Sequence, residues 1–256
     1  MFDIDLIRAL RRVAVLDHHR ELGSTSDRAK QLAADPAQAL PTLVLCDRQT
    51  AGRGRGSNRW SSAEGGLTFS LLIDPGTYGL SGNRLPALSL TTALAVCEAA
   101  EQVAGARLQI KWPNDVVNTQ RRKAAGILLE SPLPGRMVIG VGVNVNATPG
   151  EPGEALADTV TSVAATAGVH TVDPTQLLLA ILERLDKNAN GLGADDPTVH
   201  ERWSQRDALR GRFLTLETTA GPVTGHAEGF APNGALRLSD GAIVSEHLSG
   251  SVRAIH

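Results

Sequence analysis

A short segment rich in glycine and arginine carries the strongest chemical signal in the sequence. It runs from Gln49 to Gly56 as QTAGRGRG and continues to Arg59-Trp60, with no acidic residue among its arginines. Glycines let a backbone approach a ligand closely, and guanidinium groups bind carboxylate and phosphate oxygens through paired hydrogen bonds. The segment therefore predicts a loop that closes over an anion. A solvated basic loop, or an RNA-binding Gly-Arg segment, is the alternative. The shortness of the segment and its place between two apolar runs disfavour that alternative.

A second signal lies at residues 111–115, which read KWPND at the end of an apolar run. Pro113 is expected to make a tight turn, so that Lys111, Asn114 and Asp115 converge at the end of a strand. An ordinary turn, in which Asp115 bonds its local backbone, is the alternative.

Two further apolar runs contain residues that are unusual in a buried strand, a lysine in one and alternate glycines in the other. Lys123 enters the apolar run 124–129, and a buried lysine needs a partner. Taken alone, it would be interpreted as an edge-strand lysine that opposes aggregation. Residues 140–146 read GVGVNVN, and their alternate glycines predict a strand that a ligand approaches closely. A β-bulge with turn asparagines is the alternative there.

Together, these segments resemble the motifs of the biotin–protein ligase family. The family's marks are a serine-threonine pair, a GRGRxG loop, a KWPND turn, a KxxGILxE strand and a GxGxN strand, in that order. Here they fall at Ser24-Thr25, 52–56, 111–115, 123–130 and 140–144. The family usually has Asn after the serine-threonine pair, whereas this chain has Ser26. The ordered set is highly specific, although no single motif is.

The resemblance implies a two-step reaction. The carboxylate of biotin attacks the α-phosphate of ATP to give biotinyl-5′-AMP and pyrophosphate, and a lysine of an acceptor protein then attacks the acyl carbon. ATP and Mg²⁺ are implied as cofactors. The implied acceptor is a biotin carboxyl carrier protein domain of a biotin-dependent carboxylase, such as acetyl-CoA carboxylase. Two anions repel each other strongly in a dry pocket, which explains why such a site needs cations.

The resemblance also assigns the reacting residues. The implied catalytic residues are Arg55, Lys123, Asp115 and Lys111. Lys123 and Arg55 would bridge the carboxylate and the α-phosphate, and Asp115 would act as a base or orienter for the incoming amine. No protein side chain is expected to be a metal ligand.

A larger set of residues is expected to bind the two ligands. These residues are Ser24, Thr25, Ser26, Gln49, Arg53, Gly54, Arg55, Trp60, Lys123, Gly126, Gly142, Asn144 and Arg253. The residues that would bond the ureido ring of biotin are Ser24, Thr25 and Gln49. Those that would serve the nucleotide are Asn144 and Arg253.

Apolar periodicity predicts the elements that position these residues. The expected strands span residues 13–16, 42–46, 67–73, 108–112, 125–130 and 137–145, and the expected helices lie at the start, at 27–34, at 85–103 and from 173 onward. From residue 212, short β-prone runs alternate with turns. The fold class is therefore α/β (α+β), with residues 1–210 as a mixed-sheet catalytic domain and residues 211–256 as a small β domain. The resemblance relates the first domain to class II aminoacyl-tRNA synthetases and lipoate ligases, and the second to an SH3-like β-barrel.

Composition excludes several classes of protein. Apolar residues make up 42% of the chain, enough for a packed core, and the net charge of −2 predicts no general affinity for polyanions. Cys46 and Cys97 lie in apolar runs and are predicted to be buried free thiols. No apolar run reaches the roughly 18–20 residues of a membrane span, and the start lacks a secretory pattern. A cytoplasmic protein without a membrane partner is expected.

Three competing functions are less well supported. A lipoate or octanoate ligase would use a related fold and a similar acyl-adenylate, but the GRGRxG and KWPND pair favours biotin. A DNA-binding regulator is disfavoured because only 22 residues precede Gly23, too few for a helix-turn-helix module, so no DNA partner is expected. A metal hydrolase is disfavoured because the seven histidines show no HExxH-type spacing.

Overall fold

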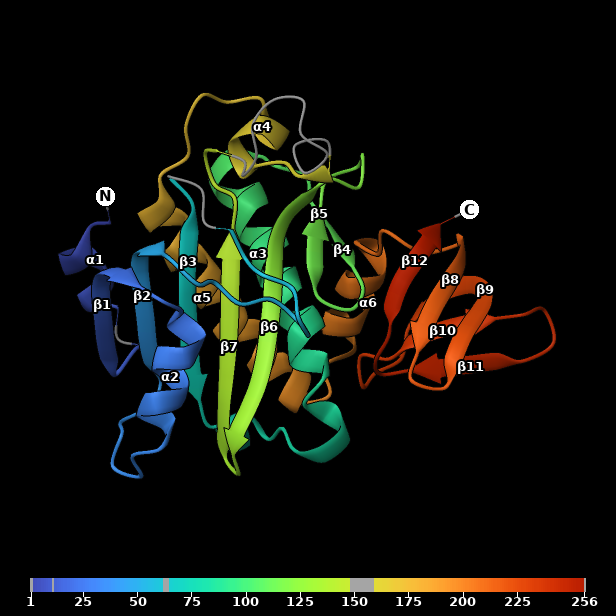
Figure 1. The fold of residues 1–256 in the computed structure, drawn as a ribbon, viewed down its shortest axis with the longest axis horizontal. Coiled ribbons are helices and arrows are strands. Elements are labelled where there is room, and N and C mark those ends of the chain that lie inside the picture. Colours follow the sequence, from blue (N-terminus) through green and yellow to red (C-terminus); the bar gives the residue numbers. More distant parts are fainter. Residues whose placement is uncertain (1, 11, 62–64, 148–158, 256) are drawn as a thin grey trace.

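The fold is built on two sheets of different size. The computed structural model describes residues 2–10, 12–61, 65–147 and 159–255. The strands of the larger sheet are β1 (Val15–Leu22), β2 (Thr42–Gln49), β3 (Leu67–Ile73), β4 (Gln109–Lys111), β5 (Asp115–Val117), β6 (Lys123–Leu133) and β7 (Arg136–Val143). They pair in the order β1-β2-β3-β7-β6-β5-β4, and β1 and β2 are parallel whereas the other pairs are antiparallel. The expected mixed sheet is confirmed (Figure 1).

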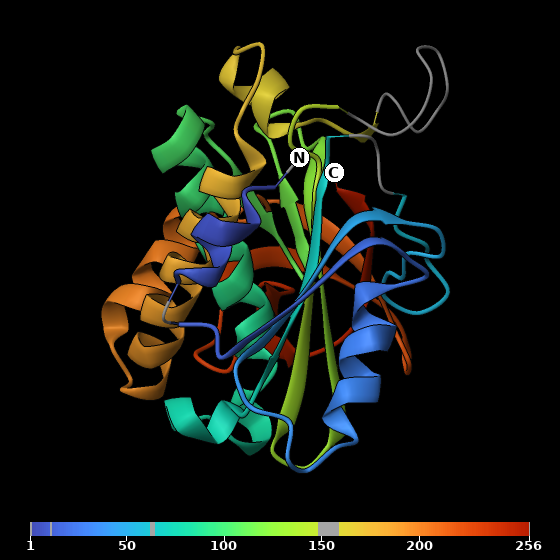
Figure 2. The same cartoon turned by 90° about the vertical axis from the view of Figure 1, so that its left-hand side faces the viewer.

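Helices cover both faces of this sheet. They are α1 (Ile4–Arg8), α2 (Thr25–Ala33), α3 (Ala87–Ala104), α4 (Val163–Ala167), α5 (Pro174–Gly193) and α6 (Pro197–Gln205), with 3₁₀ turns η1 (Pro75–Tyr78) and η2 (Gly82–Arg84). Figure 2 shows α2 on one face and α3 with α5 on the other. This double cover explains why every residue of β3 is buried.

Local sequence signals explain where the main helices begin. The Asp173 side chain accepts hydrogen bonds from the first turn of α5, and Pro174 occupies the next position, where its missing N–H costs nothing. The apolar side of α5 is buried as expected, at Leu177, Leu178, Ile181, Leu182 and Leu185. Ser24 caps α2, so the chain turns into the helix directly after the end of β1.

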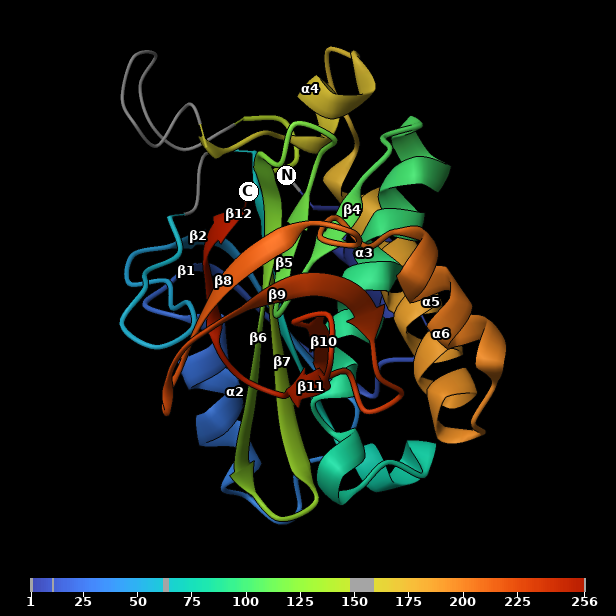
Figure 3. The same ribbon diagram turned by 90° about the vertical axis from the view of Figure 1, so that its right-hand side faces the viewer.

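The C-terminal part of the chain forms a separate antiparallel sheet. Its strands are β8 (Phe213–Thr218), β9 (Gly221–Phe230), β10 (Leu236–Ser239), β11 (Val244–His247) and β12 (Ser251–Ile255), in the order β11-β10-β9-β8-β12 (Figure 3). This sheet agrees with the small β domain expected from the sequence. The division after residue 210 falls between α6 and β8 and stays a prediction.

Several smaller expectations can also be compared with the structure. Cys46 and Cys97 are buried and free, as predicted. In the described parts of the chain, no helix has the length and apolar character that a membrane crossing requires. Strand β1 extends to Leu22, well beyond the expected end at residue 16, and the pattern did not predict β5, α6 or β12.

Candidate functional site

A cavity of about 640 Å³ opens on the face of the larger sheet that carries α2. Its walls come from the start of α2, the end of β2, the loop after β2, the β4–β5 hairpin, the first half of β6, the second half of β7, and β12. The sequence-predicted residues on these walls are Ser24, Thr25, Ser26, Gln49, Arg53, Gly54, Arg55, Trp60, Lys111, Asp115, Lys123, Gly126, Gly142 and Arg253. Motifs that lie far apart in the sequence are therefore brought to one site.

The Gly-Arg loop forms a small hairpin over the cavity. Gly54 N donates to Asn58 O at 2.9 Å, and Trp60 N donates to Gly52 O at 3.0 Å. A Cβ atom at Gly52 would lie 2.4 Å from the carbonyl oxygen of Trp60, so only glycine allows this close approach. The glycines therefore give the loop its shape, as well as access to a ligand.

Arg53 has acidic partners that were not expected from its neighbours in sequence. Its guanidinium lies 2.6 Å from Asp27 Oδ1 on α2 and 2.9 Å from Glu130 Oε1 on β6. Burial alone would raise the pKa of Asp27, but hydrogen bonds from Lys30 and Arg53 outweigh it and lower that pKa. Arg53 is therefore held by two acids, although it has no acidic neighbour in the sequence. Sequence spacing missed these acids because they lie on other elements.

A lysine–carboxylate pair lies at the other end of the cavity. Lys123 Nζ is 2.6 Å from Asp115 Oδ1, and both side chains are about one-third exposed or less. Lys111 is the register partner of Asp115 in the β4–β5 hairpin. Strand β6 lies between β7 and β5, so the interpretation of Lys123 as an edge-strand lysine is wrong. The KWPND turn likewise does more than close a hairpin, because Asp115 binds a lysine from another strand.

A glycine pair makes room for an indole ring. Gly126 and Gly142 are register partners on β6 and β7, and a Cβ atom at Gly142 would lie 2.3 Å from Trp60 Cε2. Lys123 Nζ lies 5.8 Å from the centroid of the Trp60 ring. The β3–β7 pairing is regular from Ile73–Met137 to Leu67–Val143, so the alternative of a β-bulge at these glycines is wrong.

Asn144 lies outside the cavity wall. Its side chain is buried, and its Nδ2 donates to the carbonyl oxygens of Lys123 at 3.3 Å and Thr161 at 3.1 Å. The amide therefore ties the start of β6 to the segment before α4. The expected contact between Asn144 and a nucleotide stays a prediction.

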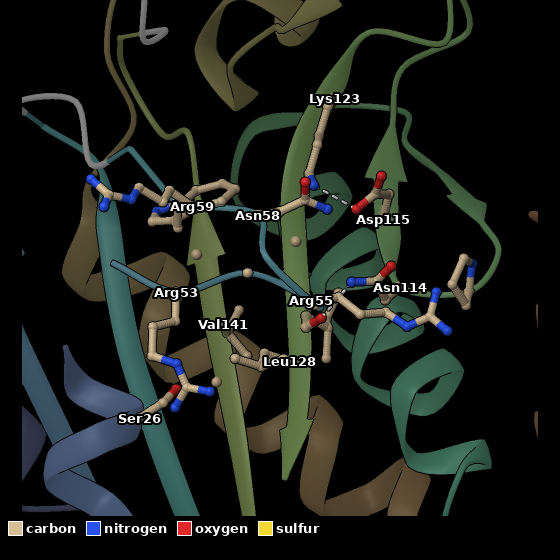
Figure 4. A pocket seen from close by; sticks show the side chains of 18 of the residues that line it. Ser26, Arg53, Arg55, Asn58, Arg59, Asn114, Asp115, Lys123, Leu128 and Val141 are labelled. Atoms are coloured by element: carbon tan, nitrogen blue, oxygen red, sulfur yellow. Dashed lines mark hydrogen bonds and ion pairs between the residues drawn. The ribbon is translucent and has the colours of Figure 1, made fainter. Parts of the chain in front are cut away.

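The cavity changes in polarity along its length. In Figure 4, Leu128 lies between Ser26 on one side and the Lys123–Asp115 pair on the other. Leu128 comes from β6, shares the cavity face with Gly140 of β7, and was not singled out in the sequence. The cavity thus suits an elongated ligand with a polar head, an apolar middle and an anionic end.

The C-terminal sheet contributes to the same cavity. Ser251, Val252 and Arg253 of β12 line it, and Arg55 Nη1 donates to the carbonyl oxygen of Gly250. Only Arg253 was predicted from the sequence. Ser251 and Val252 were not predicted, because a strand that mixes small, apolar and basic residues gives no signal that it faces a distant loop.

The described residues offer little to a resident metal ion. They contain no group of three or more His, Cys, Asp or Glu side chains that could hold one. Within those same residues, Asp115 is the one carboxylate on the cavity wall, and it is already paired with Lys123.

Comparison with known proteins agrees with the motifs and the cavity. The profile of the Biotin/lipoate A/B protein ligase family matches residues 21–146. The chain is 34% identical to the bifunctional ligase/repressor BirA of Bacillus subtilis, over 87% of this chain and 69% of that protein. It is 33% identical to the biotin–[acetyl-CoA-carboxylase] ligase of Paracoccus denitrificans, over 83% of this chain and 90% of that one.

A solved structure extends this likeness to the whole fold. The biotin protein ligase from Aquifex aeolicus, in complex with biotin and ATP, superposes with a TM-score of 0.80 at 30% identity. The match covers 94% of this chain and 99% of that one, so it includes both sheets. On its sequence, its fold and the residues that line its cavity, the chain belongs to the biotin–protein ligase family.

Proposed function

We propose that the protein is an ATP-dependent biotin–protein ligase. It activates biotin as biotinyl-5′-AMP and transfers the biotinyl group to a lysine of a biotin carboxyl carrier protein domain. The observation that carries this proposal is the graded cavity, which has hydroxyl and amide groups at one end, the Leu128 side chain in the middle, and Lys123 at the other end. Biotin has the matching order of ureido ring, apolar chain and carboxylate.

The first step joins two anions, and the residues at the cationic end explain how they are brought together. A carboxylate oxygen of biotin bonds to the α-phosphorus of ATP while the bond to pyrophosphate breaks. Lys123, oriented by Asp115 at 2.6 Å, lies where it would offset the repulsion between carboxylate and phosphate. Arg55 reaches the cavity from the loop and would add a second cation. Fixed cations of this kind act most strongly on the charge that develops in the transition state.

Magnesium fits the site as a companion of ATP. Asp115, the one carboxylate among the described residues of the cavity wall, is already paired with Lys123, so Mg²⁺ would be bound chiefly by phosphate oxygens of ATP and by water. When bound, Mg²⁺ would neutralise part of the triphosphate charge. No protein cage is needed for that role.

The second step requires an unprotonated amine. The acceptor lysine attacks the acyl carbon, the bond to AMP breaks, and the amine loses a proton. Asp115 is the one carboxylate among the described residues of the cavity wall and would orient the amine or accept that proton. Because ATP is a substrate, we infer that the reaction takes place in the cytoplasm.

Mass analysis tests the proposal directly. Purified protein mixed with ATP, Mg²⁺ and biotin should form biotinyl-5′-AMP, and addition of a carrier domain should convert it to biotinylated carrier and AMP. A parallel reaction with lipoate should give little adenylate. Preferential formation of lipoyl-adenylate would instead identify a lipoate ligase, and absence of both adenylates would overturn the proposal.

A further inference from the structure

A chain of buried and part-buried hydrogen bonds runs behind the polar end of the cavity. Gln49 Oε1 lies 2.7 Å from the backbone nitrogen of Thr25 and 3.1 Å from Thr25 Oγ1. Ser70 Oγ lies 2.9 Å from Thr25 Oγ1 and 3.1 Å from Ser26 Oγ. Ser70, on β3, is fully buried and does not line the cavity, whereas the other three residues do.

Hydrogen-bond chemistry fixes the direction of every bond in this chain. A backbone N–H only donates, so the Gln49 atom that faces it must be the amide oxygen, which only accepts. The Thr25 hydroxyl therefore donates its single proton to Gln49. Ser70 must then donate to Thr25, and Ser26 must donate to Ser70, because each hydroxyl has one proton.

The direction of the chain decides what a ligand meets. The amide oxygen of Gln49 already accepts two hydrogen bonds, so its NH₂ group is the part that remains for the ligand, as a donor. The Ser26 proton is committed to Ser70, so the Ser26 oxygen faces the ligand as an acceptor. Gly140 on β7 keeps this arrangement possible, because a Cβ atom there would lie 2.5 Å from Ser26 Oγ.

We propose that Ser70 is a positioning residue that sets this polarity, so that Gln49 presents a donor and Ser26 an acceptor to the ureido ring. A ureido ring offers a carbonyl oxygen to Gln49 and an N–H to Ser26, whereas a dithiolane ring offers neither. The inference rests on the proposed function and adds the basis of its specificity. It also explains how serine serves at position 26, since Ser70 takes the proton and leaves an acceptor.

The first test removes the Ser70 hydroxyl. In Ser70→Ala the Ser26 hydroxyl loses the acceptor of its hydrogen bond and can turn toward the ligand, and the Thr25 hydroxyl loses the group that donates to it. The Kd for biotin should therefore rise about tenfold, equivalent to ~1.4 kcal/mol. The Kd for ATP and the kcat at saturating biotin should stay within twofold, because the cationic end is untouched. Calorimetric titration and a single-turnover adenylation assay measure these quantities.

A matched control lies two residues away on the same strand. Thr68 is also buried, but its hydroxyl donates to Cys46 O at 3.2 Å. It takes no part in the hydrogen bonds that link Gln49, Thr25, Ser70 and Ser26. Thr68→Val removes a buried hydroxyl just as Ser70→Ala does, and it should leave the Kd for biotin within twofold. Equal losses in both variants would show that Ser70 is merely structural.

The second test measures polarity with altered ligands. Two cyclic carbamate analogues of biotin each replace one ureido N–H by oxygen. For wild type, the analogue whose new oxygen faces Ser26 should bind about 100-fold more weakly than biotin, because two acceptors then meet in a buried site. In Ser70→Ala this ratio should fall to about tenfold or less, since Ser26 can turn its proton toward the ligand.

Outcomes for the two proposals are distinguishable. The role of Ser70 alone would be overturned if wild type forms biotinyl-adenylate but Ser70→Ala shows the same ratio of carbamate Kd to biotin Kd as wild type. Absence of biotinyl-adenylate in wild type would overturn the proposed function. If Ser70→Ala does not fold, Ser26→Ala decides the matter, because it should bind biotin and the weaker carbamate nearly equally. A preserved ratio in Ser26→Ala would overturn the inference.

Discussion

Lys123 is the cation best placed for the proposed adenylation. Its Nζ lies 2.6 Å from Asp115 Oδ1 and faces the ring of Trp60, so it is oriented before any ligand arrives. Removing one such oriented charge typically lowers a rate by ~10²–10³. We expect Lys123→Ala to lower the single-turnover rate of biotinyl-adenylate formation by this factor, with little change in Tm.

A lysine on the opposite side of the sheet provides the control. Lys187 is exposed on α5, far from the cavity wall, and Lys187→Ala should adenylate biotin at the wild-type rate. Adenylation by Lys123→Ala within a few-fold of wild type would remove Lys123 from the mechanism.

Asp207 should make the stability of the fold depend on pH. Burial raises the pKa of Asp207 to about 6, against its ordinary 3.8, although the backbone N–H of Leu209 partly opposes the rise. Its Oδ2 is buried and has no hydrogen-bond partner. The folded state therefore binds the proton more tightly than the unfolded state. The free energy of unfolding should fall as pH rises from about 4, and this destabilisation by Asp207 should be complete above about 6.

The Asp207→Asn variant isolates this effect. Asparagine does not ionise, so the free energy of unfolding of the variant minus that of wild type should increase by about 2 kcal/mol between pH 4 and pH 7. Urea unfolding at several pH values measures the difference. A difference that stays flat across this range would contradict the raised pKa.

At the level of single residues, the sequence showed which side chains meet but not how they pair. The motifs placed Lys123, Asp115, Gln49 and Thr25 at one site, because chemistry restricts the residue types that can serve there. Partners such as Ser70 gave no signal, since a serine within the apolar run of β3 looks like any small residue of a buried strand. Hydrogen-bond direction depends on atomic positions and could not be predicted from spacing.

The loop after β2 is tethered by the elements around it. Arg53 binds Asp27 of α2 and Glu130 of β6, and Lys30 also contacts both acids, at 2.9 and 3.1 Å. Glycines on either side of Arg53 make the rest of the loop costly to fix. We therefore expect the loop to be protease-sensitive around residues 53–59 without ligand, and to become protected when biotinyl-5′-AMP is added.

Glu130→Gln tests the tether itself. It keeps the size of the side chain but weakens the charge-assisted bond to Arg53, so cleavage of the free enzyme in the loop should increase several-fold. Glu183→Gln, at an exposed position on α5, serves as the control and should leave the cleavage rate unchanged. If ligand gives no protection in wild type, or if Glu130→Gln is cleaved no faster, the tether does not govern the loop.

The elements were predictable in proportion to their burial. β3 was predicted with its full bounds, because both of its faces are covered and its run is apolar throughout. β1 lies at the edge of the sheet and alternates poorly, so only its apolar start was predicted. Helix α6 was missed even though Asp196 and Pro197 mark its start, because its apolar residues are few.

At the scale of the molecule, the two sheets form one site. Trp112 of the KWPND turn donates its indole N–H to Gly234 O at 3.1 Å, and β12 supplies part of the cavity wall. The sequence predicted both the mixed sheet and the small β domain, but their mutual contact depends on pairs more than 100 residues apart. Arg55 and Gly250 are such a pair, which joins the loop to the second sheet.

Arg55 is expected to control the escape of the intermediate. An acyl-adenylate is a reactive mixed anhydride, so the site must exclude water until the acceptor lysine arrives. Arg55 lines the cavity, where it can contact the adenylate, and its guanidinium also donates to Gly250 O of the second sheet. These two contacts can hold the loop closed. A charge-assisted hydrogen bond is worth roughly 1.5–3 kcal/mol, and glycine at this position would also add backbone freedom.

Arg55→Gly should therefore release biotinyl-5′-AMP about one to two orders of magnitude faster than wild type, at ~1.4 kcal/mol per tenfold change. Released adenylate would acylate exposed lysines of bystander proteins. Release of radiolabelled adenylate from preloaded enzyme measures the rate. Arg48→Ala is the control, because Arg48 pairs with Glu21 at 3.2 Å on an exposed surface and does not line the cavity. Unchanged release from Arg55→Gly, with synthesis still active, would show that other residues keep the loop closed.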